Sequence, residues 1–440
     1  MSKLSMWERA SKMAAQTPAD RNRYVDLLRA LSISAVVLGH WIMAAPQVDN
    51  GVAKLHHLLD VQAMSHWLTW VFQVMPIFFF VGGFSNGVSW DGAQKKQLPY
   101  SSWIEARMRR LLGPVMPLVV LWIGLGMLGW FTGIPAENIR IGSQIALVPV
   151  WFLAIYFIIV LLVPLTRRAW HRFGMVSVYV PILLAVVGDY LFMHSSLQWF
   201  GWFNYLFVWG AVHQLGYAWQ QGHLNGVLKL LILGAFGLGA LIVFTVYGPY
   251  PISLVGVPSQ DFSNTTPPKL PLLALGLAQI GFLLAIEGPV RRWLARGRVW
   301  TATVLLNGLI MPIFLWHSTV MMLVLGTCIW LFPNLLSAEP GTSLWWSLRP
   351  LWVLGFLTIL LTVLPLFLRL EKALTADIRY DTSTLRLFIA AILMCGGLAV
   401  LAGKGITGNG AFGLNWYFCL MPVLGGFIAL FRTPKFFHRG

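Results

Sequence analysis

Charged residues are scarce in this chain of 440 residues, since Asp, Glu, Lys and Arg together make up only 10% of it. Hydrophobic residues make up 58%, whereas a typical soluble domain is about 25% charged and about 45–50% apolar. So few charges cannot cover the surface of a soluble fold of this length. The apolar content also excludes a disordered chain, and three cysteines are too few for a disulfide scaffold. The remaining class is a polytopic membrane protein, whose lipid-facing surface must be apolar.

Acidic residues are the scarcer of the two charge types, with 15 Asp and Glu against 31 Lys and Arg, which gives a net charge of +16. In a soluble protein this excess would suggest a nucleic-acid partner. In a membrane protein it suggests instead that basic residues gather in the cytoplasmic loops. We therefore expect the lipid bilayer, and no nucleic acid, as a partner of the chain.

Twelve stretches are apolar enough to be membrane spans, each of which needs about 20 apolar residues. The ninth stretch, 300–332, is too long for one straight crossing and contains Pro312. We expect a kinked, tilted or broken helix there. The twelve stretches are 27–45, 66–90, 111–131, 145–165, 174–193, 199–219, 226–247, 270–287, 300–332, 345–368, 386–402 and 412–431.

An even number of spans puts both termini on the same side of the membrane. On this topology 26 of the 31 Lys and Arg residues fall on the side that holds the termini. The positive-inside rule then predicts an all-α, multi-pass bundle of about 12 transmembrane helices, with both termini in the cytoplasm, in the plasma (inner) membrane. The five basic residues on the opposite side are Lys54, Arg140, Lys269, Arg349 and Lys404.

The longest external segment, 248–269, carries five prolines. Proline fixes one backbone dihedral angle and so stiffens the chain. A long segment of this kind is either a stiff connector or a lid over an outward-facing site, and the sequence leaves both open.

The first span contains three ionisable residues, Asp26, Arg29 and His40. Arg29 and His40 are eleven residues apart, which is about three helical turns and about 16 Å, so they share one face of the helix. Arg29 would lie at the cytoplasmic interface and His40 beyond the midplane, toward the outside. Singly, they could be a positive-inside anchor and a packing residue. Their shared face makes a common functional site an equal alternative, because ionisable groups inside a bilayer are costly.

A second basic group, Arg107, Arg109 and Arg110, leads into the third span. Arg107 and Arg110 are three residues apart and share a helix face. Guanidinium groups suit phosphate, so this pair and Arg29 could hold a polyanionic cofactor at the cytoplasmic mouth. By itself the group is more typical of a positive-inside cluster.

Two further segments combine small, aromatic and polar residues. Gly83 and Gly87 follow a run of phenylalanines in the second span and are spaced for close helix contact. His317 lies in the ninth span shortly after Pro312. This proline would free a backbone carbonyl, which favours a water-lined site. Because no His, Cys or acidic cluster has the spacing of a known site, we expect no metal.

These segments together resemble the acyltransferase-three family of integral-membrane O-acyltransferases. The spacing of Arg29 and His40, with ten residues between them, resembles its Arg-x10-His signature. Further segments resemble its other motifs in the same order, over roughly residues 20–320. The segments that are similar to its other motifs are Phe78–Phe84, Arg107–Arg110, Pro149–Leu153 around Trp151, and Pro312–Ser318, which contains Trp316 and His317.

The resemblance implies transfer of an acyl group, most often acetyl, from cytoplasmic acyl-CoA to a hydroxyl of an extracytoplasmic glycan or glycolipid. The coenzyme A phosphates would meet Arg29, Arg107 and Arg110. His40 would act as general base on the acceptor hydroxyl or carry the acyl group itself. His317 would orient the acceptor or stabilise developing charge. Direct transfer and an acyl-enzyme both stay open, as do the acceptor, the acyl chain length and the oligomeric state.

The chain departs from the family pattern in three respects. Gly82 occupies the usual serine position, and Ile155–Phe157 stand where many members carry a glutamate. These positions therefore leave the carboxylate partner of the histidine unassigned. Asp26 is expected to pair with Arg29, and Asp189 is either a substitute partner or an exposed interfacial residue. The residues with a candidate supporting role are Asp26, Phe80, Gly83, Trp151, Asp189 and Trp316.

The third departure is length. The family core usually has about ten helices, so the chain divides into a leader (1–26), an acyltransferase core (27–370) and two additional helices with a basic tail (371–440). The additional helices would serve packing or a partner. An ion-coupled secondary transporter of a small anionic solute is the alternative function, since it too needs polar residues within its spans. A scaffold for other envelope enzymes is a third.

Overall fold

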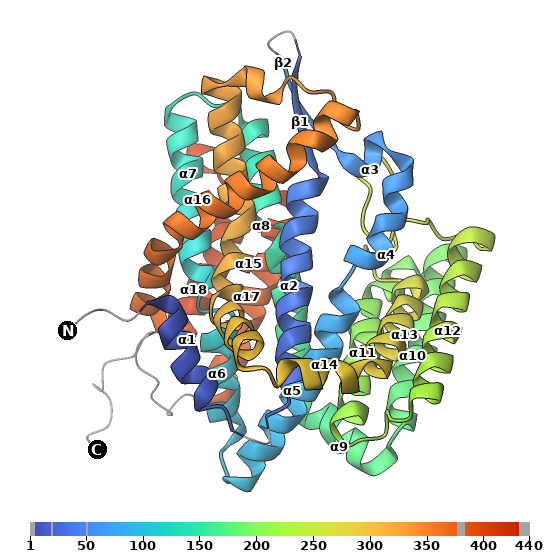
Figure 1. Ribbon diagram of the computed structural model, residues 1–440. Coiled ribbons are helices and arrows are strands. Elements are labelled where there is room, and N and C mark those ends of the chain that lie inside the picture. The colour runs from blue at the N-terminus through green and yellow to red at the C-terminus, as the bar shows by residue number, and fades with distance from the viewer. Residues whose placement is uncertain (1–4, 19–20, 50–51, 376–382, 431–440) are drawn as a thin grey trace, which may run out of the picture. The chain divides into compact units, whose positions relative to one another are not determined.

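The computed structural model describes residues 5–18, 21–49, 52–375 and 383–430. The described residues are mostly helical, and their regular strands form one two-stranded hairpin (Figure 1). The predicted all-α class is therefore confirmed, with the hairpin as an addition. The predicted basic tail lies outside the described residues, as do the first residues of the leader.

The chain divides into two compact units. The first unit combines Met1–Ser89, Leu162–Met311 and Pro333–Pro350. Its elements are α1 (Met6–Ala15), α2 (Arg23–Met43), β1 (Ala44–Asp49), β2 (Val52–His57), α3 (Leu58–Val61), η1 (Ala63–Leu68), α4 (Thr69–Phe72), most of α5 (Met75–Lys95), α9 (Val163–Phe173), α10 (Val176–His194), η2 (Gln198–Phe203), α11 (Asn204–Gln220), α12 (Val227–Ile242), η3 (Val243–Tyr247), α13 (Leu270–Ala285), α14 (Glu287–Leu294), the first part of α15 (Gly297–Leu331), η4 (Pro333–Leu336) and the start of α16 (Ser343–Thr375).

The second unit combines Trp90–Leu161, Pro312–Phe332 and Leu351–Gly440. Within it α17 packs against α8 and α18, and α18 also contacts α7. The two helices predicted as additional therefore pack against helices of the predicted core. The elements of this unit, besides the ends of α5, α15 and α16, are α6 (Tyr100–Leu111), α7 (Val115–Phe131), α8 (Ala136–Leu161), α17 (Thr384–Lys404), η5 (Ala411–Gly413) and α18 (Trp416–Leu430).

Eight helices of the described chain are long and apolar enough to cross a membrane, and the number rises to ten if two bent pairs each form one span. The pairs are α6 with α7, bent by 44°, and α13 with α14, bent by 57°. The count of twelve is not confirmed, although every predicted stretch contains a helix. α11 and α18 fall short because 17 and 15 residues rise only about 26 and 22 Å, against a hydrocarbon core of about 30 Å. The cytoplasmic placement of the termini stays a prediction.

The ninth predicted span forms a single element, α15, which contains 35 residues and continues through Pro312. The helix is therefore not broken at the proline. At 1.5 Å per residue it is about 52 Å long, which exceeds the thickness of the hydrocarbon core.

Helix α2 begins where the sequence provides a cap. The side chain of Asn22 accepts hydrogen bonds from the backbone N–H groups of Tyr24 and Val25, at 3.0 and 3.4 Å. An asparagine at this position satisfies amides that the first helical turn leaves without partners. The cap fixes the start of the helix that carries Arg29 and His40.

Helices α5 and α11 cross at close range through glycines. A Cβ atom added to Gly216 would lie 2.6 Å from the backbone nitrogen of Phe84 and 2.8 Å from Cα of Gly83, and one added to Gly83 would collide with the carbonyl oxygen of His213. Only glycine permits this approach, because the obstructing atoms belong to backbone. The predicted close contact at Gly83 is confirmed.

We expect Gly216→Ala to lower the thermal unfolding midpoint of the detergent-solubilised protein, because the added methyl group forces α5 and α11 apart. Gly210→Ala is the matched control on the same helix, since a Cβ atom there meets nothing within 4 Å. It should leave the midpoint unchanged or raise it through better helix propensity. Equal midpoints for the two variants would contradict the close crossing.

Candidate active site

Arg29 is held in place by a cluster of polar groups near the start of α2. Its Nη1 atom donates to Oδ1 of Asp26 at 3.3 Å, and its Nη2 atom donates to Oγ of Ser85 on α5 at 2.8 Å. Arg21 binds the same carboxylate in a fork, at 2.7 and 3.1 Å. The predicted pairing of Asp26 with Arg29 is confirmed. Since Arg21 neutralises the carboxylate as well, two guanidinium groups converge on one buried acid.

Two residues of this cluster were missed by the sequence analysis. Ser85 lies about one turn after Gly82 on α5, and its hydroxyl accepts the hydrogen bond from Arg29. Asn307 of α15 donates to the backbone carbonyl of Asp26 at 3.0 Å and so joins α15 to α2. The helical spacing from Gly82 could have indicated Ser85. The contact of Asn307 depends on helix packing and had no local signal.

His40 lies in the last turn of α2, directly before the hairpin. The hairpin register places His57 opposite Ala44, near enough to His40 for the two rings to interact electrostatically. Nη1 of Arg349 donates to the carbonyl of Ala44 at 3.0 Å, and its guanidinium carbon lies 3.4 Å from the ring centroid of Trp345. The end of α2 that carries His40 is thus tied to the start of α16. Arg29 and His40 lie on one helix, about 16 Å apart along its axis.

Phe80 and Gly83 on α5 contribute packing. Phe80 is 2% exposed and stacks on Trp219 of α11, with ring centroids 5.1 Å apart. Beside the glycine crossing, the amide nitrogen of Asn86 lies 3.1 Å from Nε2 of His213, and both side chains are buried. This polar pair was not anticipated, because nothing in the local sequence of α11 distinguishes His213 from a packing residue.

The second unit carries the other predicted phosphate-binding arginines, on α6. Arg110 is exposed, and the guanidinium carbon of Arg107 lies 5.5 Å from the ring centroid of Trp103. Arg109 is buried and forms an ion pair with Glu105 at 2.9 Å. The structure therefore assigns Arg109 a structural partner. Arg107 and Arg110 remain the arginines of this group that a phosphate could reach.

The second unit also contains His317 and the motif residues Trp151 and Trp316. Trp316 is fully buried and stacks on Phe367, with ring centroids 3.7 Å apart, while the half-buried Trp151 contacts Phe152 edge to face. His317 is also fully buried. Its Nδ1 atom lies 2.6 Å from the carbonyl oxygen of Phe314, and its Nε2 atom lies 3.1 Å from the hydroxyl of Ser318.

Comparison with known protein families agrees with this arrangement. A family model described as an acyltransferase domain, that of the acyltransferase-three family, matches residues 22–346. The chain belongs to the acyltransferase-three family. The match includes both α2, with Arg29 and His40, and the His317 region of α15. No curated protein and no solved structure matches the chain.

Membership of the acyltransferase-three family and the many apolar helices make this chain a multi-pass membrane protein of acyltransferase type. The match ends within the first turns of α16. Most of α16 and the whole of α17 and α18 therefore lie beyond the matched part of the chain.

Asp189, the proposed substitute carboxylate, is 1% exposed, so the alternative of simple interfacial exposure is wrong. Its oxygens accept hydrogen bonds from the amide of Asn204 at 2.8 Å, the hydroxyl of Tyr250 at 3.0 Å and the backbone N–H of Leu270 at 2.8 Å. These donors come from α11, the external segment and α13. The carboxylate thus joins α10 to three other parts of the first unit.

The external segment 248–269 is bound to its surroundings along much of its length. Leu254 accepts from the side chain of Gln73 at 2.8 Å and donates to the hydroxyl of Thr69 at 2.9 Å. Lys269, at its end, is fully buried, and burial lowers the pKa of its amine to about 8. Its nitrogen donates to the carbonyl of Pro267 at 3.0 Å. These contacts favour the stiff connector over the lid.

We expect Asp189→Asn to lower the free energy of unfolding by about 1–3 kcal/mol, because one oxygen becomes an NH2 group that faces hydrogen-bond donors. The unfolding midpoint and proteolysis of the external segment would report the loss. Asp261→Asn, at an exposed position of the same segment, is the control and should change neither. If activity disappears while the midpoint stays unchanged, Asp189 acts as a partner of the catalytic histidine instead.

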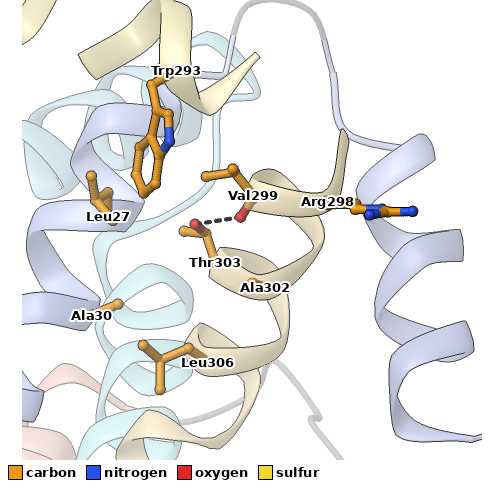
Figure 2. Close-up of a pocket in the computed structure, with 8 residues that line it drawn as sticks. All are labelled: Leu27, Ala30, Trp293, Arg298, Val299, Ala302, Thr303 and Leu306. Carbon is orange, nitrogen blue, oxygen red and sulfur yellow. Dashed lines mark hydrogen bonds between the residues drawn. The ribbon is translucent and has the colours of Figure 1, made fainter. Parts of the chain in front are cut away.

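A pocket of about 360 Å³ lies between α2, α14 and the start of α15 (Figure 2). The hydroxyl of Thr303 donates to the carbonyl of Val299 on its own helix at 3.0 Å, and Arg298 points away from the other labelled residues (Figure 2). An apolar group suits this lining better than a phosphate does. The lining residues are Leu27, Ala30, Trp293, Arg298, Val299, Ala302, Thr303 and Leu306.

Proposed function

We propose that the protein transfers an acyl group, most often acetyl, from cytoplasmic acyl-CoA to a hydroxyl of an extracytoplasmic glycan or glycolipid, in the plasma (inner) membrane. The observation that carries this proposal is the placement of Arg29 and His40 on one helix of an acyltransferase-three protein. Arg29, the proposed cation for the phosphates, and His40, the proposed base for acyl transfer, then lie about 16 Å apart along α2. The pantetheine arm of coenzyme A provides the length between its phosphates and its thioester.

Arg29 is the principal phosphate-binding residue in this proposal. Its side chain is 27% exposed, and the carboxylate of Asp26 and the hydroxyl of Ser85 fix its orientation. A guanidinium that is already oriented loses less conformational entropy when it binds a phosphate. Arg107 and Arg110 of α6 supply further positive charge for the same donor.

His40 acts on the acceptor. In direct transfer its imidazole takes the proton of the acceptor hydroxyl as the oxygen attacks the thioester carbonyl, the carbon–sulfur bond breaks, and the proton passes to the coenzyme A sulfur. In the alternative, the imidazole nitrogen itself receives the acyl group and hands it to the acceptor. His317 has the role of orienting the acceptor or stabilising charge.

We expect His40→Ala to reduce label transfer from radiolabelled acetyl-CoA to a fractionated envelope acceptor by about 10²–10⁴-fold, the contribution typical of a general base. His194→Ala, at an exposed position of α10, is the control and should transfer as the wild type does. Both variants should elute as the wild type does in size-exclusion chromatography. Equal transfer by His40→Ala and the wild type would contradict the assigned role.

We expect Arg29→Ala to raise the KM for acetyl-CoA by about 10–100-fold, the equivalent of a lost charge-assisted hydrogen bond. Arg21→Ala is a matched control, because Arg21 binds the same Asp26 carboxylate but is 52% exposed. Arg21 still neutralises Asp26 in the Arg29 variant, so the loss reports on the donor and not on an unpaired acid. An unchanged KM in Arg29→Ala would exclude the phosphate contact.

The transporter alternative predicts a different result. Sealed vesicles would then show ion-coupled uptake of a small anion that needs no acyl-CoA. Label transfer that depends on acetyl-CoA supports the acyltransferase.

A further inference from the structure

His317 and Ser318 of α15 form a hydrogen-bonded pair that the proposed function does not use as a pair. The Ser318 hydroxyl lies 3.1 Å from Nε2 of His317, and the other ring nitrogen, Nδ1, lies 2.6 Å from the carbonyl oxygen of Phe314. His317 is 0% and Ser318 is 1% exposed. All three residues lie on the same stretch of helix.

The hydrogen-bond chemistry fixes the direction of both contacts. A carbonyl oxygen only accepts, so Nδ1 of His317 must carry the proton in its bond to Phe314. In the neutral ring Nε2 is then an acceptor, and the Ser318 hydroxyl must donate to it. In an activated nucleophile, the serine hydroxyl donates to one nitrogen of an imidazole, and the other nitrogen donates to an acceptor that fixes the ring. The Ser318, His317 and Phe314 groups have this arrangement.

We propose that Ser318 is the acyl-carrying nucleophile of this acyltransferase and that His317 is its general base. The inference rests on the proposed transfer from acyl-CoA to an acceptor hydroxyl and deepens it, since it selects an acyl-enzyme over direct transfer. It gives the acyl-carrying role to Ser318 in place of His40, gives the role of the base to His317, and leaves His40 to orient the acceptor. The substrate group that this pair would bind and attack is the thioester carbonyl of the acyl donor. The Phe314 carbonyl holds the imidazole in the tautomer that accepts the serine proton.

The two half-reactions balance. Ser318 Oγ attacks the thioester carbonyl while its proton moves to Nε2 of His317; the carbon–sulfur bond then breaks, and the coenzyme A sulfur takes that proton. The acceptor hydroxyl next attacks the Ser318 ester. Its proton passes to Nε2 of His317 and from there to Ser318 Oγ as the ester bond breaks, so serine and histidine return to their first state.

The surroundings of the pair suit an ester intermediate. The ring of Phe314 contacts Phe152 at 6.0 Å between centroids, and the adjacent Thr319 hydroxyl is bound by the indole N–H of Trp122 at 3.0 Å. This aromatic shell excludes water, which would hydrolyse the ester. Since both residues are buried, acylation requires neighbouring side chains to move when the donor binds.

The test is to trap the intermediate. Purified full-length protein is mixed with radiolabelled acetyl-CoA without acceptor, quenched in denaturant and mapped by peptide mass spectrometry. We expect label on Ser318 that resists neutral hydroxylamine, as an oxygen ester does. Ser318→Ala should carry no label and lose transfer. Ser318→Cys should carry label that hydroxylamine removes, because a thioester is labile.

Thr327→Val is the matched control, since it removes a hydroxyl from an exposed position of the same helix and leaves the pair intact. It should be labelled as the wild type is. Label on His40 or another residue, wild-type turnover by Ser318→Ala, or acetyl transfer with no label on Ser318 would overturn the inference and leave the proposed function standing. Absence of any transfer dependent on acetyl-CoA would overturn both.

Discussion

A polar side chain inside the hydrocarbon layer has no water to bind, so its hydrogen-bond partner must come from the protein. Three of the described polar residues illustrate that constraint. Asp26 is bound by two arginines, Asp189 by three donors, and His317 by a carbonyl and a hydroxyl. Each set connects helices or fixes a side chain, so the polar groups that suggest chemistry also hold the apolar helices in register.

The close approach of α5 and α11 also positions the candidate site. Gly83 and Gly216 remove the side-chain layer between α5 and α11. Ser85 follows two residues after Gly83, on a helix whose position is fixed by this crossing, and it bonds Arg29. Packing that carries no chemistry of its own therefore helps to decide where the guanidinium of Arg29 is held.

Much of the fold was predictable, because apolar runs and basic loops are local properties of the sequence. The helices appear where the runs are, and the ordered set of motifs that begins with Arg29 and His40 predicted the family. Span counting was less successful at α11 and α18, whose apolar runs exceed the lengths of the helices they form. In the site, the Asp26–Arg29 pair was predictable from a spacing of three residues, whereas Asn307 was not, since its contact joins distant parts of the chain.

The sequence by itself determined that this is an integral membrane protein and to which family it belongs. It also determined which helix carries Arg29 and His40. Those conclusions depend on composition and on residue spacing along single helices. Only the tertiary structure decided that Arg29 donates to Ser85 of α5 and that the buried carboxylate of Asp189 accepts from Asn204, Tyr250 and Leu270. It likewise brought the hydroxyl of Ser318 to 3.1 Å from Nε2 of His317 and the carbonyl oxygen of Phe314 to 2.6 Å from its Nδ1. The reason is physical: a hydrogen bond depends on distance and direction between atoms, and helix packing and side-chain rotamers set both.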